Sequence, residues 1–348
     1  MGSGPLWNQV IKHHGDLCQN NMWKNFLYIH NYFGVEDMCL THTHQLAMDM
    51  QLFVVSPVFI YLLWRSRRLG MIVIAAAAAA STLLRYYVIY SKRLTVIVYN
   101  GVSYVYQAAV FWLFNDAVSP TRLFSVDSEM VFADTMPKIS HRVPDIRLTV
   151  GENLGRNPTR LSQVFASGNL TYILPTHRLT VYLMGVVVGY LMHRTTGRIV
   201  LRKTQVWLGW SAAIILALLS VFGLYRGAFP DYRYEPHEHA LYGALAPIMW
   251  GGYISWTIYA SWAGYGGVFG ALLSWKWFRV FSRVTYSLYL VQFFVYFYNV
   301  GVRRTVQYYS PLQMFEVGEV LCILLASTAL TLFVDLPFQE VKKVIWTH

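Results

Sequence analysis

Residues 42–64 read HTHQLAMDMQLFVVSPVFIYLLW, and this stretch decides the fold. From Leu46 onward it is nearly continuously apolar and about long enough to cross a bilayer as a helix. It nevertheless carries Asp49 and Gln51, and His42 and His44 stand at its beginning. Polar groups at membrane depth are costly unless they are paired or face a wet cavity. The stretch therefore predicts a membrane-spanning helix that carries functional groups.

Two interpretations of Asp49 stay open at this stage. Its carboxylate either lines a wet cavity, or it lies among the lipid headgroups and is capped by a neighbouring helix. His42 precedes Asp49 by seven residues, which is two helical turns, so the spacing predicts that both lie on one face. A histidine beside a carboxylate can act as a general base. A histidine at a membrane interface can equally be a headgroup contact.

The composition is that of a membrane protein. Of the 348 residues, 55% are hydrophobic and only 13% are charged, whereas soluble domains carry about 25% charged residues. Basic residues concentrated in cytoplasmic loops explain the net charge of +11 without nucleic acid. No basic cluster is interleaved with exposed aromatic residues in a nucleic-acid-binding module. We expect membrane lipids and hydrophobic small molecules as partners, and no nucleic acid.

The apolar runs predict an all-α fold, a polytopic transmembrane bundle of about seven spans. The spans are expected at residues 44–64, 69–90, 178–193, 206–224, 240–262, 284–302 and 317–336. Residues 1–43 are expected to form an extracytoplasmic lead-in with a short aromatic helix near Trp23–Tyr32, and residues 44–348 the transmembrane domain. Residues 91–176 are expected to be a long outer loop, with 95–115 as an interfacial or re-entrant helix. The alanine run within 69–90 predicts a helix that packs closely against its neighbours.

The distribution of Lys and Arg orients this topology. With the N-terminus outside, the short outer segments hold six basic residues: Lys12, Lys24, Arg226, Arg233, Arg303 and Arg304. The cytoplasmic loops hold twelve: Arg65, Arg67, Arg68, Arg194, Arg198, Arg202, Lys203, Lys276, Arg279, Arg283, Lys342 and Lys343. The positive-inside rule favours this arrangement. It predicts an integral protein of the plasma membrane or endoplasmic reticulum with an extracytoplasmic N-terminus.

Other chemistry has little support in the sequence. The segment Glu235–His239 (EPHEH) has metal-ligand residue types, but no further clustered ligand is evident, so we expect a solvated loop and no metal. Motifs for phosphate loops, serine hydrolases and zinc sites are missing, which predicts no tightly bound cofactor.

The cysteines and Arg85 each leave two interpretations open. Cys18 and Cys39 form a disulfide if their region is extracytoplasmic, or remain two free thiols. Arg85 either reaches the interface or pairs with a buried acid such as Asp49.

Several motifs in order resemble one family. They are WKNFLYIHN (23–31) followed by Cys39, LAMDMQL (46–52), RLTVYLMGVVVGY (178–190), SRVTYSLYLVQ (282–292) and DLPF (335–338). Together they resemble the animal nose-resistant-to-fluoxetine family, whose membrane part belongs to the acyltransferase-3 superfamily. The resemblance runs from about residue 20 to the C-terminus.

The resemblance implies a membrane protein that transfers acyl groups from a cytosolic thioester donor, with acyl-CoA as the expected donor, to a lipid or extracytoplasmic acceptor. We expect a catalytic set of Asp49, His42 and Gln51, with the role of His42 based on its spacing to Asp49. The resemblance implies Arg85, Arg178, Tyr286 and Gln292 as residues that bind substrate or donor, although Arg178 could instead anchor a headgroup. The Cys18–Cys39 pair suits the disulfide of the family's outer region.

The sequence also departs from the family pattern. The superfamily's histidine base and its Arg-x-x-x-Arg pair would precede residue 1, which predicts that this chain lacks an N-terminal part. Gln292 stands where the family often has histidine. These departures leave two alternatives open, a lipid or xenobiotic carrier that kept the fold without the chemistry, and an inactive fragment.

Overall fold

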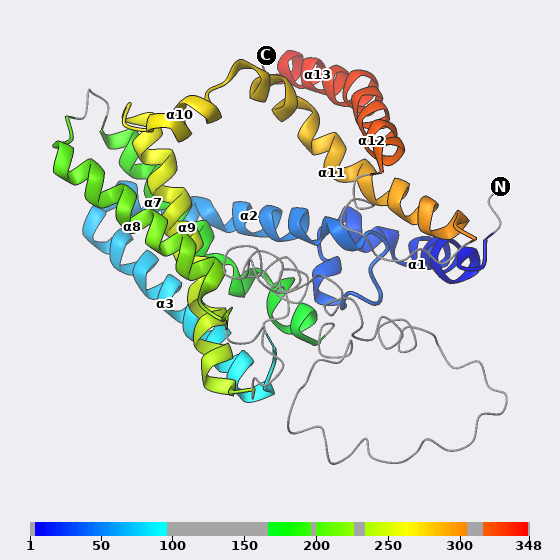
Figure 1. Ribbon diagram of the computed structural model, residues 1–348, viewed down its shortest axis with the longest axis horizontal. Helices are drawn as coiled ribbons and strands as arrows, with labels where there is room; N and C mark the ends of the chain where they lie inside the picture. The colour runs from blue at the N-terminus through cyan, green and yellow to red at the C-terminus, as the bar shows by residue number, and fades with distance from the viewer. Residues whose placement is uncertain (1–3, 96–165, 196–199, 226–233, 305–315, 347–348) are drawn as a thin grey trace, which may run out of the picture. The chain divides into compact units, whose positions relative to one another are not determined.

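The computed structural model describes residues 4–95, 166–195, 200–225, 234–304 and 316–346, and in these ranges every regular element is a helix (Figure 1). The helices gather in two compact units. The first unit is Met1–Gln51 with Gly264–His348, and the second is Leu52–Ala263. Apart from Thr95, the helix expected at 95–115 lies outside the described residues.

The first unit contains the N-terminal helices and the C-terminal helices. Its elements are η1 (Asn8–Lys12), α1 (His13–Phe26), η2 (His30–Tyr32), η3 (Thr41–Thr43), the start of α2 (His44–Arg65), α10 (Gly267–Leu273), α11 (Lys276–Val302), α12 (Val317–Leu330), η10 (Thr331–Asp335) and α13 (Leu336–Trp346). The aromatic helix expected near Trp23–Tyr32 is wrong in its position, because α1 ends at Phe26. Tyr28 then has a φ of 56°, a left-handed backbone conformation that cannot continue a helix.

Small hydroxyl residues join α11 to α12. The Thr331 hydroxyl donates to the Ser287 hydroxyl at 2.8 Å, and both side chains are buried. At the other end of the pair, Asn299 donates to Glu319 at 2.6 Å, and Arg303 forms an ion pair with Glu316. Small residues and interhelical hydrogen bonds are how membrane helices pack in the absence of water. The chain then turns through the π-helical η10 into α13 (Figure 1).

The second unit holds the rest of α2 and the helices that follow it. These are α3 (Arg67–Lys92), η6 (Gly168–Tyr172), η7 (Pro175–His177), α7 (Leu179–Arg194), α8 (Lys203–Phe222) and α9 (Pro236–Trp262). Pro57 lies inside α2 and has no N–H to offer to the carbonyl of Phe53. The Ser56 hydroxyl donates to that carbonyl at 2.8 Å, which explains how the helix tolerates the proline.

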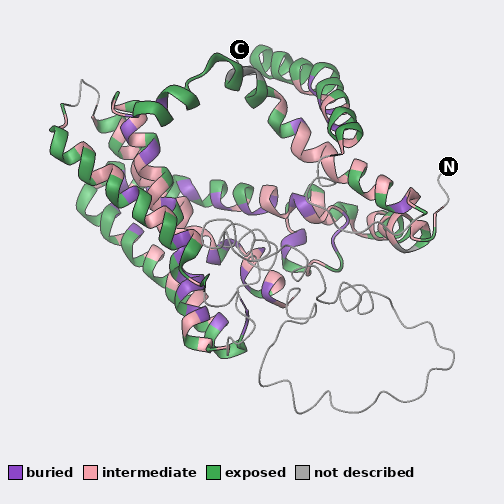
Figure 2. Cartoon of the chain, viewed as in Figure 1, coloured by how far each residue is buried: buried purple, intermediate pink, exposed green. Residues whose placement is uncertain are grey.

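The apolar core of the second unit lies between α2, α3 and α7. Phe59 and Leu63 pack with Ile74 of α3 and Leu183 of α7. Gly70 lies so close to Leu63 that a Cβ atom would approach its backbone to 2.7 Å, so only glycine fits the tight α2–α3 turn. Ala77 and Ala78 also pack against this core, as the alanine run predicts. Large apolar side chains remain exposed on the outer faces of α3 and α8, where a bilayer would cover them (Figure 2).

In the part of the chain that the structure describes, four helices are long and apolar enough to cross a membrane: Thr41–Arg65, Arg67–Lys92, Lys203–Phe222 and Val317–Ile345. A helix is present at each of the seven expected spans, but α7 has only 16 residues and α9 and α11 are not among those four. The structure therefore supports a helical membrane protein, whereas the seven-span bundle with its long loop is not confirmed.

The segment Glu235–His239 begins a helix, and the expectation of a solvated loop is wrong. Pro236 occupies the first turn of α9, where its missing N–H costs nothing. Glu238 follows in the first turn, where an acid favours the helix dipole. His239 is buried, and its ring lies 4.6 Å from that of Tyr234.

Candidate functional site

Gln51 fixes the start of α2 to the preceding loop. Its amide nitrogen donates to the carbonyl of Tyr28 at 2.5 Å and to the side-chain oxygen of Asn31 at 2.9 Å. Its amide oxygen accepts from the Asn31 amide at 3.3 Å and from the Tyr32 hydroxyl at 3.1 Å. The side chain predicted to be catalytic is thus held entirely by protein groups. It positions the helix that carries Asp49.

Replacement of Gln51 by leucine should lower the free energy of unfolding by about 2 kcal/mol, because it removes both hydrogen bonds to the buried Asn31. The measurement is thermal unfolding of the purified chain in detergent. Gln45→Leu is the matched control, since Gln45 lies on the same helix and forms no hydrogen bond with the described residues. Equal melting temperatures for the two variants would contradict this role of Gln51.

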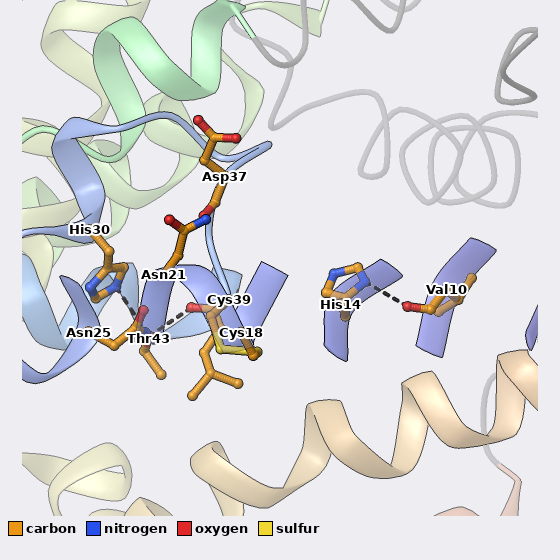
Figure 3. Close-up of a disulfide and its surroundings, with 10 residues drawn as sticks. Val10, His14, Cys18, Asn21, Asn25, His30, Asp37, Cys39 and Thr43 are labelled. Carbon is orange, nitrogen blue, oxygen red and sulfur yellow. Dashed lines mark hydrogen bonds between the residues drawn. A yellow bond between two sulfur atoms is a disulfide. The ribbon is translucent and has the colours of Figure 1, made fainter. Parts of the chain in front are cut away.

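A second polar cluster lies beside the Cys18–Cys39 disulfide, which joins α1 to the segment before η3 (Figure 3). The Thr43 hydroxyl donates to the carbonyl of Leu40 at 2.7 Å and accepts from Asn25 at 2.9 Å. His30 Nε2 lies 3.2 Å from the same hydroxyl, and burial lowers the pKa of His30. Because the hydroxyl proton is already donated to Leu40, His30 and Thr43 do not form a base and nucleophile pair. The cluster stabilises the entry to α2.

His42 lies in η3 and not in α2, which begins at His44. Its ring stacks on Phe293 of α11 with centroids 4.3 Å apart, and its backbone carbonyl accepts from the Tyr289 hydroxyl. His42 is 4% exposed, whereas Asp49 is exposed. His42 thus lies in the 3-10 turn directly before α2, and the shared face of His42 and Asp49 stays a prediction.

Asp49 is the predicted catalytic residue that remains accessible. It follows the start of α2 by five residues, about 8 Å along the axis, and precedes the anchored Gln51 by two. It belongs to the candidate span Thr41–Arg65. An ionisable side chain within a span is a functional candidate, since desolvating its charge in lipid would be costly.

The second unit brings the two predicted arginines to one place. Arg85 of α3 donates from Nη1 to the carbonyl of His177 at 3.5 Å, and Arg178 follows directly in the chain. The Arg178 guanidinium lies 4.5 Å above the ring of Tyr172. His177, which the sequence analysis missed, is 5% exposed. Burial, with a smaller effect from the Arg85 charge, lowers the pKa of His177 to about 4.

The remaining predicted site residues lie on α11. Tyr286 is exposed and Gln292 is half-buried. The side chain of Gln292 forms no hydrogen bond with the described residues, so its amide is available to a ligand. Among the described residues, no group of three His, Cys, Asp or Glu side chains could hold a metal ion.

These features define a class: a helical membrane protein whose span-embedded carboxylate and clustered arginines lie near helix ends. The comparisons with known proteins support the coarser statement, a membrane protein. The chain is 24% identical over 354 residues to nose resistant to fluoxetine protein 6 of Caenorhabditis elegans, a match that covers 98% of this chain and 35% of that protein. It supports the assignment of the chain to the nose-resistant-to-fluoxetine family that the motifs predicted. The chain spans about a third of the length of this curated relative. No family model and no solved structure matches the chain.

Proposed function

We propose that the chain transfers acyl groups within a membrane, from an acyl-CoA donor on the cytosolic side to a hydroxyl acceptor on the other side. The observation that carries the proposal is Asp49, an exposed carboxylate inside a candidate span. The hydrogen bonds of Gln51 hold this part of α2 in place. The backbone two residues from Asp49 is therefore fixed, and a fixed supporting element is what a site for proton transfer requires.

The proposed role of Asp49 is to activate the acceptor. The acceptor hydroxyl oxygen attacks the thioester carbonyl, its proton passes to Asp49, and the carbon–sulfur bond breaks. The proton then passes to the departing thiolate. His42 and Gln51 would act indirectly, because His42 is enclosed by Phe293 and Tyr289 and Gln51 is occupied by the loop. The disulfide agrees with an extracytoplasmic position for this end of α2.

A carrier without chemistry is the second candidate. It is favoured by Gln292, an amide at the position where the family often has histidine, since an amide can bind a ligand and cannot act as a base. Such a protein would move lipids or hydrophobic compounds through the same helices.

The test uses the purified chain in liposomes with acyl-CoA labelled in the acyl group. We expect label to appear in the lipid fraction or on an added hydroxyl acceptor, above the level of empty liposomes. Movement of a fluorescent hydrophobic probe across the same liposomes, unaffected by acyl-CoA and without acyl transfer, would replace the proposal by the carrier. Absence of both activities would overturn both candidates for this chain.

A further inference from the structure

Arg85, His177 and Arg178 form a cluster of basic residues that the packing of α3 against η7 and α7 holds in place. The Ser81 hydroxyl donates to the carbonyl of Thr176 at 2.5 Å, which fixes the turn before His177. At the next residue of α3, the Thr82 hydroxyl lies 3.1 Å from that of Thr180. The chain positions of these residues are thus set by hydrogen bonds on both sides of the cluster.

The cluster has positive charge to offer. Arg178 forms no ion pair in the described part of the chain, and its Nε atom is buried without a hydrogen bond. The Nδ1 atom of His177 is also buried without a hydrogen bond, and this residue is 5% exposed. Burying a guanidinium or a ring nitrogen without a partner is unfavourable. An oxyanion would satisfy the buried Nε–H of Arg178, and the planar guanidinium matches phosphate and carboxylate oxygens.

The cluster lies at one particular end of its helices. Arg85 follows Arg67 by 18 residues, which is about 27 Å along α3. The helix α7 runs antiparallel to α3, because Thr180 donates to the carbonyl of Ala78 while Leu183 packs near Ile74. Its last residue, Arg194, is therefore on the same side as Arg67. Both belong to the basic loops that the positive-inside rule places in the cytosol, so the cluster lies at the opposite boundary.

We propose that Arg85, His177 and Arg178 form an oxyanion-binding site at the extracytoplasmic boundary, which takes the phosphate or carboxylate headgroup of an amphiphile. This position separates the two arginines from a cytosolic acyl-CoA and assigns them to the acceptor side, which narrows their expected role of binding substrate or donor to the substrate. The two arginines supply the charge and the hydrogen bonds to the anion, and the backbone carbonyl of His177 positions Arg85 beside Arg178. The site does not depend on acyl transfer, because a carrier of the same fold could use it equally.

The test is a binding titration of the purified full chain in uncharged detergent, followed by tryptophan fluorescence. The probes are dihexanoyl phosphatidic acid, inorganic phosphate, and dihexanoylglycerol, which has the same acyl chains without the phosphate. We expect saturable binding of the phosphatidic acid and none of the dihexanoylglycerol. Arg178→Gln and Arg85→Gln should each weaken binding by about tenfold or more, the loss expected for a charge-assisted hydrogen bond.

The matched control is Arg194→Gln, which removes an exposed arginine at the far end of α7 and should leave binding unchanged. Arg178→Lys keeps the charge without the planar fork and should retain part of the affinity, which guards against a variant that fails to fold. Equal affinity for inorganic phosphate would confirm the oxyanion site and assign it to a free anion. Absence of anion binding, or an equal loss in Arg194→Gln, would overturn the proposal. Neither result bears on acyl transfer, which is assayed separately.

Discussion

Replacing Cys18 by serine is expected to lower the free energy of unfolding by about 3 kcal/mol. The Cys18–Cys39 bond closes a loop with a sequence separation of 21 residues, and losing it restores the corresponding entropy to the unfolded chain. A Cys39→Ser variant should be destabilised at least as much, because Cys39 is 1% exposed and the new hydroxyl would be buried away from water. The measurement is thermal unfolding of the purified chain in detergent, with and without a reductant.

The third cysteine provides the control for this experiment. Cys322 is a free, exposed thiol on α12, so Cys322→Ser should melt like the unmodified chain. The reductant should lower the melting temperature of the unmodified chain and of Cys322→Ser, and leave Cys18→Ser unchanged. If the reductant had no effect on the unmodified chain, the disulfide would contribute nothing to stability. The loss should also loosen the Asn25–Thr43 contact, because both partners lie next to the bridge (Figure 3).

The helices could be predicted where apolar composition decides them. Residues 44–64 and 69–90 were expected as spans, and the structure has α2 at His44–Arg65 and α3 at Arg67–Lys92. The basic run between them and the apolar runs on either side are local signals. The N-terminal helix was expected too late in the chain, near Trp23–Tyr32, whereas α1 is His13–Phe26. Its residues are polar and mixed, and its position depends on tertiary contacts such as the disulfide. The beginning of α9 was missed because the histidines and acids of residues 235–239 were considered as metal ligands and then assigned to a loop. Pro236 is a signal for a helix start.

The sites were less predictable, since they depend on contacts between distant residues. The amide of Gln51 is bound by residues 28–32, and no spacing rule links those residues to α2. His177 meets Arg85 across a sequence separation of 92 residues, so its burial beside an arginine could not be foreseen. The position of His177 directly before Arg178 was the one feature of the sequence that could have indicated its place in the site. The shared face of His42 and Asp49 stays a prediction, because His42 lies in the 3-10 turn before α2 begins at His44.

Removing the charge of Asp49 should have the largest effect on activity. If Asp49 accepts the proton of the acceptor, Asp49→Asn should reduce the rate of acyl transfer by about a hundred- to ten-thousandfold, the usual contribution of general acid–base catalysis. The asparagine has nearly the same shape, so folding and acceptor binding should change little. Initial rates with labelled acyl-CoA in liposomes, together with the melting temperature, measure both effects.

Asp37→Asn is the control for this prediction, because Asp37 is an exposed acid of the first unit that lies before η3 and outside the candidate span. Its acyl-transfer rate should match that of the unmodified chain. Asp49→Glu keeps a carboxylate at a slightly different reach and should recover part of the rate. Full activity of Asp49→Asn would remove Asp49 from the chemistry. A loss of probe movement together with acyl transfer in Asp49→Asn would place the carboxylate in ligand binding, because a base that only moves a proton has no part in carriage.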